Sequence, residues 1–160
     1  MFIGMLRVLL NWRFLPAKFQ AWLFGTATRV LEAVSGLGLV GYAAVFAFAP
    51  DEIYAWRIYY KFQDIPEAWT VGVLGAAGLL QTALLFARGF KGNVAAAYLL
   101  LFSGFVWFLI SVAFLGAYPP LNTGMVVPPL LAFFCALAGN NALKFLFSAQ
   151  KARGLANEGS

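Results

Sequence analysis

Residues 92–143 read GNVAAAYLLLFSGFVWFLISVAFLGAYPPLNTGMVVPPLLAFFCALAGNNAL, a stretch without one charged side chain. A helix needs about 20 apolar residues to cross a membrane, because the hydrocarbon core is about 30 Å thick and each residue adds about 1.5 Å. The stretch is too long for one crossing, and the prolines and asparagine at 118–122 are typical of a turn. It therefore predicts two membrane-spanning helices, at about 94–117 and 126–147, joined by an uncharged loop.

Two shorter uncharged gaps precede this stretch, at 33–50 and 68–87. Each has room for one crossing, so we expect further helices at about 31–49 and 69–87. The composition agrees, since 62% of the residues are hydrophobic and 11% are charged, against about 45–50% and about 25% in soluble domains. The predicted fold class is an all-α integral membrane protein with four transmembrane helices, which excludes a soluble enzyme.

The basic residues predict the orientation of these helices, because short cytoplasmic loops carry an excess of Lys and Arg. Nine of the eleven would fall on one side of the membrane, and only Arg57 and Lys61 would fall on the other. We therefore expect both termini in the cytoplasm. The net charge of +5 is then explained by topology and by attraction to lipid headgroups, so the expected partner is the bilayer and not a nucleic acid.

The chain divides into three predicted segments. Residues 1–30 form an amphipathic, basic segment expected to lie on the membrane surface, with basic side chains placed to meet lipid headgroups: Arg7, Arg13, Lys18 and Arg29. A transmembrane helix or a docking surface for a partner are the alternatives for this segment. Residues 31–148 form the four-helix bundle, and residues 149–160 form a polar cytoplasmic tail.

The loop between the first two predicted crossings, 51–68, is unusually aromatic. Together with the start of the next helix it holds six rings: Tyr54, Trp56, Tyr59, Tyr60, Phe62 and Trp69. Helical spacing within the loop favours a short helix that lies flat on the membrane. Tyr and Trp prefer the headgroup region, so an aromatic belt is one interpretation, and a surface that recognises a protein partner is the other.

Small residues predict where the helices touch, because helices associate in a bilayer through close backbone approach. The predicted packing residues are Gly38 and Gly41 in the first helix, Gly72, Gly75, Ala76 and Gly78 in the second, and Ala132 and Ala136 in the fourth. We expect the first two helices to be the closest pair. The bulkier third helix offers aromatic surface to lipid, to a pigment or to another protein.

The chain lacks the residues of most familiar chemistries. It has no histidine and one cysteine, which excludes histidine-ligated metal or haem, cysteine clusters, an internal disulfide and Ser-His-Asp catalysis. No ionisable residue is expected at mid-depth in the membrane, and Glu32 lies near a helix start where Arg29 can pair with it. Gln81 and Asn140 lie toward the same ends of their helices, and a hydrogen bond between them is one interpretation, whereas a polar pore lining is the other. We expect no cofactor, no metal and no enzymatic activity.

The leading functional hypothesis is therefore assembly, in which the chain is an accessory or scaffold subunit. It would pack against copies of itself or against other integral membrane subunits. One alternative is a holin-like protein that permeabilises the membrane when many copies cluster, and another is an immunity or exclusion protein that binds a foreign membrane protein through loop 51–68. The layout resembles many small bacterial and phage membrane proteins, and we expect a bacterial inner (plasma) membrane.

Overall fold

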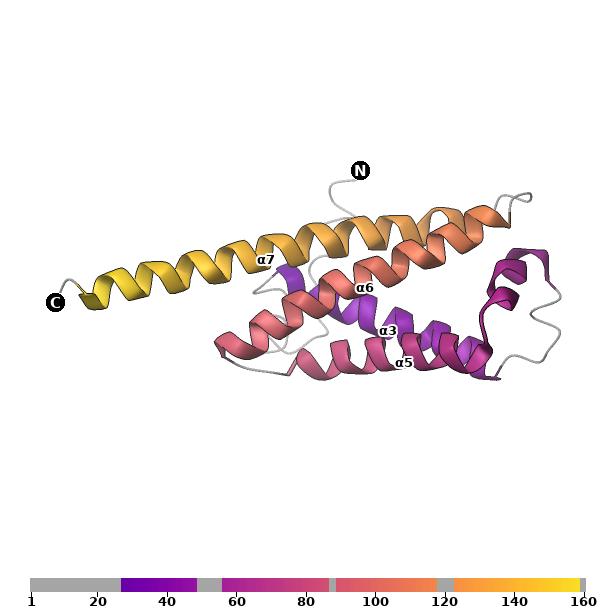
Figure 1. Cartoon of the computed structure of the whole chain (residues 1–160), viewed down its shortest axis with the longest axis horizontal. Helices are drawn as coiled ribbons and strands as arrows, with labels where there is room; N and C mark the ends of the chain where they lie inside the picture. The colour runs from indigo at the N-terminus through magenta and orange to yellow at the C-terminus, as the bar shows by residue number, and fades with distance from the viewer. Residues whose placement is uncertain (1–26, 49–55, 87–88, 118–122, 159–160) are drawn as a thin grey trace, which may run out of the picture.

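The computed structural model describes residues 27–48, 56–86, 89–117 and 123–158, and within these ranges the chain is helical with no strand. The four α-helices are α3 (Ala27–Phe48), α5 (Glu67–Leu84), α6 (Phe90–Gly116) and α7 (Val127–Glu158). Two short 3-10 helices, η1 (Arg57–Asp64) and η2 (Thr123–Met125), lie between them (Figure 1). The all-helical prediction is confirmed.

Three of the helices are long and apolar enough to cross a membrane, namely Thr28–Phe48, Phe90–Gly116 and Val127–Lys151. The remaining helix, α5, has 18 residues and a length of about 27 Å. It begins at Glu67 and contains Gln81, and these polar side chains lower its mean hydropathy. The fourth crossing therefore stays a prediction.

Local sequence signals explain where the helices begin. Pro66 precedes α5, whose first turn carries Glu67, a favourable position for an acid because helix N-termini are partly positive. Gly89 precedes α6 with a φ of 90°, which a residue without a Cβ adopts at little cost. Two prolines, at 128 and 129, stand in the first turn of α7, where their missing N–H groups are not needed.

The helices pack as two pairs. One pair is α3 with α5 and the other is α6 with α7, and the two pairs contact each other chiefly through α5 and α6. In Figure 1 η1 lies at the end of the molecule where α3 ends and α5 begins, and α7 extends beyond the other helices at the opposite end. Residues 149–158, predicted only as a polar tail, continue α7 as a helix.

The core between the pairs is apolar and includes four fully buried side chains, Leu39, Phe46, Leu100 and Trp107. Large apolar side chains also cover the outside of the bundle, as at Leu37, which is 62% exposed. Only 11% of the most apolar part of α7 is buried, against 44% in α6. Such a surface is suited to lipid or to protein partners and not to water.

Several predicted features lie outside the described residues. They include most of the amphipathic segment with Arg7, Arg13 and Lys18, the loop residue Tyr54, and the turn at 118–122.

Candidate functional site

The closest approach between helices joins α3 and α5. A Cβ added to Gly78 would lie 2.7 Å from the Gly36 carbonyl oxygen, and one added to Gly36 would lie 2.8 Å from the Thr82 hydroxyl. Any side chain at either position would collide with the neighbouring helix. The backbones of the two helices therefore meet at residues without a side chain, Gly36 and Gly78. The Thr82 hydroxyl donates a hydrogen bond to the Gly78 carbonyl at 2.8 Å.

The other predicted packing residues of α3 and α5 have different surroundings. A Cβ on Gly38 would lie 2.9 Å from the Trp107 ring of α6, and one on Gly75 would lie 3.6 Å from the Ala43 Cβ, an ordinary contact. Among the described residues, no atom lies within 4 Å of a Cβ placed on Gly41 or Gly72. These two glycines are exposed, as is Ala76.

The contact between α6 and α7 depends on two glycines that the sequence-based packing set did not include. A Cβ on Gly104 would lie 3.1 Å from the Ala132 carbonyl oxygen, and one on Gly139 would lie 2.8 Å from the Leu101 side chain. Ala132 is buried, whereas the Ala136 side chain is exposed. The sequence does carry a signal for this contact, because Ala132 and Gly139 are seven residues, or two helical turns, apart and so lie on the same side of the helix.

Buried polar groups pair between helices. The Trp107 indole donates to the Ser35 hydroxyl at 2.9 Å, and the Ser103 hydroxyl of α6 donates to the Gln81 side-chain oxygen of α5. The predicted bond between Gln81 and Asn140 is wrong, because Asn140 is exposed on α7 and Gln81 faces α6 instead. These two bonds tie neighbouring helices together, whereas Ser111 donates to the Trp107 carbonyl of its own helix and the Gln81 amide nitrogen is buried without a hydrogen-bond partner among the described residues.

The aromatic loop residues divide into two groups. Phe62 is 4% exposed, with its ring centroid 4.9 Å from that of Phe46 and 5.6 Å from that of Phe114. Tyr59 packs against the same cluster, 5.8 Å from Phe114. The remaining described rings face outward: Trp56, Tyr60 and Trp69, each more than half exposed. Two of the predicted partner-binding rings are therefore part of the internal packing.

The outward side of α5 is hollowed. Small side chains spaced by four residues, Ala68, Gly72 and Ala76, line a shallow open groove bordered by Trp69 and Val73. We call these five residues the α5 outer face. The groove is distinct from the Gly78 contact, which lies on the side of the helix that packs against α3.

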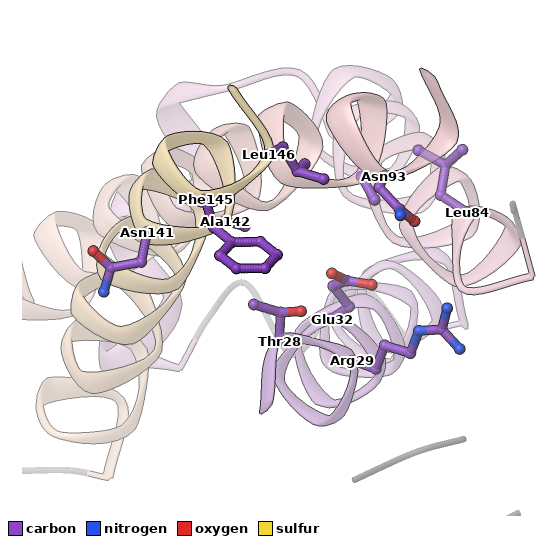
Figure 2. Close-up of a pocket in the computed structure, with 10 residues that line it drawn as sticks. Thr28, Arg29, Glu32, Leu84, Asn93, Asn141, Ala142, Phe145 and Leu146 are labelled. Carbon is purple, nitrogen blue, oxygen red and sulfur yellow. The ribbon is translucent and has the colours of Figure 1, made fainter. Parts of the chain in front are cut away.

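A second hollow lies at the end of the bundle where α3 and α6 begin, α5 ends and α7 passes alongside (Figure 2). Its volume is about 330 Å³, and its lining includes Thr28, Arg29 and Glu32 of α3, Asn93 of α6, and Phe145 of α7. We call it the Glu32 cavity. Glu32 is 7% exposed, and Thr28 and Arg29, about one turn earlier on α3, both interact with its carboxylate.

Sequence reasoning identified Glu32 and Arg29 as a pair but not the cavity around them. Within the described ranges, no three Cys, Asp or Glu side chains are grouped so as to hold a metal ion. The Glu32 cavity can therefore offer one carboxylate, one guanidinium, an amide and an aromatic ring to a ligand. The chain has no significant match among protein-family models, curated proteins or solved structures.

Proposed function

We propose that this protein is a non-enzymatic subunit of the bacterial inner membrane whose role is assembly with copies of itself or with other integral membrane subunits. It would cross the membrane four times, with α3, α5, α6 and α7, and keep both termini in the cytoplasm. The distribution of Lys and Arg supports this orientation.

The observation that carries the proposal is the α5 outer face. Small residues four apart let two helices approach closely in a bilayer, and Ala68, Gly72 and Ala76 have this spacing. Inside the bundle, α5 already uses Gly78 in this way against α3. Within the part of the chain that the structure describes, the second small-residue face is unfilled, since no atom lies within 4 Å of a Cβ placed on Gly72.

The character of α5 supports the same conclusion. It is the one described α-helix that is not among the three candidate membrane spans, yet most of its residues outside the α3 and α6 contacts are exposed. A helix from a second copy laid in the groove would shield this face from lipid. It would also gain van der Waals contact, which drives helix association in membranes.

Disulfide cross-linking in native membranes tests the proposal. In a Cys135→Ala background, Ala76→Cys should form a dimer of twice the chain mass on mild oxidation. Leu37→Cys is the matched control, because Leu37 is 62% exposed on α3 and lies outside the groove. Adding Gly72→Leu should abolish the Ala76→Cys dimer.

Gly72→Leu should leave the monomer folded, because its side chain would enter open space. Its melting temperature in detergent should therefore stay within a few degrees of the parent's. An Ala76→Cys chain that remains monomeric and joins no other membrane subunit, or that cross-links no better than Leu37→Cys, would contradict assembly through α5.

A further inference from the structure

The Glu32 cavity lies at one end of the helix bundle. Its lining comes from the first turns of α3 and α6, the last turn of α5, and α7 near Lys144. Lys91 and Lys144 are exposed within one helical turn of lining residues. Because Lys and Arg concentrate where a membrane protein meets the headgroups, we place the cavity beside the headgroup layer.

Glu32 is the unusual side chain at this level. It is the one acidic residue within the three helices that could span a membrane. Only 7% of its surface is exposed. An ionised carboxylate removed from water is costly unless charged or hydrogen-bonding groups compensate it. A carboxylate in this position is by default a candidate for function.

The surroundings of Glu32 are suited to a small ammonium group. Figure 2 shows the Glu32 carboxylate and the Asn93 amide pointing toward each other across the cavity, with the Phe145 ring beside them. A carboxylate accepts strong hydrogen bonds from an ammonium, an amide oxygen can accept another, and an aromatic ring attracts a cation to its face. Three helices thus supply three groups that favour the same ligand charge.

A positive charge, the Arg29 guanidinium, lies about one helical turn before Glu32 on α3. Arg29 lines the same cavity, and Figure 2 shows its guanidinium beyond Glu32, on the side away from Thr28 and Phe145. Guanidinium groups bind phosphate through paired hydrogen bonds. The cavity therefore offers a set of acceptors at Glu32 and Asn93 and a cation that can bind phosphate at Arg29. A volume of about 330 Å³ falls within the range of sites for small ligands, about 300–1,000 Å³.

We propose that the Glu32 cavity binds the headgroup of an amine-bearing phospholipid, with the ammonium on Glu32 and the phosphate at Arg29. The chemistry recognised is an ammonium joined to a phosphate by a two-carbon link. A membrane lipid is the source that fits the depth of the site, since its acyl chains would continue along the apolar outside of the bundle. The site is separate from the α5 outer face and does not depend on assembly.

Native mass spectrometry of the full chain tests the proposal. The protein is released from micelles that contain equal amounts of phosphatidylethanolamine, phosphatidylcholine and phosphatidylglycerol. We expect one retained phosphatidylethanolamine per chain, in about tenfold preference over the other two, because only its headgroup donates N–H bonds to a carboxylate. Equal retention of the three lipids would overturn the proposal.

Two variants assign the preference to the cavity. Glu32→Gln removes the charge with little change in volume and should abolish the preference, whereas Glu67→Gln, the same change at an exposed acid, should keep it. A Glu32→Gln protein that still prefers phosphatidylethanolamine would exclude this site. If Glu32→Gln does not fold, Phe145→Leu provides the second variant, since the ring is 74% exposed and its loss should reduce retention severalfold.

A soluble headgroup distinguishes the two possible sources of the ligand. Glycerophosphoethanolamine has the same ammonium and phosphate without acyl chains. We expect it to displace the bound lipid only at more than a hundredfold molar excess. Displacement at equal concentration would overturn the assignment to a membrane lipid.

Discussion

The indole nitrogen of Trp107 on α6 donates a hydrogen bond of 2.9 Å to the Ser35 hydroxyl on α3, and both side chains are buried. This bond ties α3 to α6 at the centre of the bundle, where Cys135 of α7 is also fully buried. Ser35 has room for this contact because the Trp107 ring lies against Gly38, one turn along α3.

Removing this hydroxyl should destabilise the bundle. Ser35→Ala leaves the Trp107 N–H buried without an acceptor, which we expect to cost about 1–2 kcal/mol, within the range for hydrogen bonds inside membrane proteins and for orphaned donors. Denaturation in mixed detergent micelles measures the change. Ser148→Ala is the control, because Ser148 is exposed and bonds only its own helix; equal stability of the two variants would contradict the role of Ser35.

The glycine contact between α3 and α5 should tolerate no methyl group. Gly78→Ala would bring its Cβ to 2.7 Å from the Gly36 carbonyl oxygen, so the helices must separate, at a cost of about 1–3 kcal/mol. Gly41→Ala adds the same methyl where no atom lies within 4 Å, and it should be neutral or stabilising because Ala favours a helix. Melting temperatures of both variants in one detergent give the ranking, and the reverse order would refute it.

The aromatic loop should contain rings that stabilise the fold and rings that do not. Phe62→Ala empties a site between Phe46 and Phe114 and should cost about 3 kcal/mol or more. Trp56→Ala should change stability by less than about 0.5 kcal/mol, because the Trp56 ring is 61% exposed. If chemical denaturation finds the two variants equally stable, η1 is not packed on the bundle in solution.

The proposed orientation predicts opposite labelling of two positions. Asp64→Cys lies in η1, with the native side chain 67% exposed, and Ala156→Cys lies near the end of α7. In a Cys135→Ala background, a membrane-impermeant thiol reagent should label position 64 on intact cells and label position 156 only after lysis. Labelling of position 156 alone on intact cells would reverse the topology.

The paired polar groups predict a closed bundle. The Gln81 side-chain oxygen is bonded by Ser103, and Ser35 by Trp107. Among the described residues, the buried side-chain atoms without a partner are the Thr70 hydroxyl and the Gln81 amide nitrogen. Few polar groups therefore remain to line a path for ions, and conducting pathways need such a lining. Liposomes with few copies per vesicle should retain a small dye. Leakage that rises steeply with protein density, and that Gly72→Leu abolishes, would instead favour the holin-like alternative.

The sequence by itself determined the helices. The predicted helix at 94–117 lies within α6, Phe90–Gly116, to within one residue at its end, and the one at 69–87 overlaps α5, Glu67–Leu84. Helix length and apolar character are local properties, and proline, glycine and charge mark the ends of apolar stretches. Dense glycines predicted the close pairing of α3 with α5, and the position of Glu32 near a helix start predicted that Arg29 can pair with it.

Only the tertiary structure decided which side of each helix faces which neighbour. Lipid and core are both apolar, so the pattern of hydrophobic residues does not mark the inward side of a membrane helix as it does in water. This is why the sequence placed the α7 contact on Ala132 and Ala136, whereas the helix turns Ala132, Cys135 and Gly139 inward. The Glu32 cavity was beyond sequence reasoning for the same reason, because its groups come from separate helices and meet only when those helices pack.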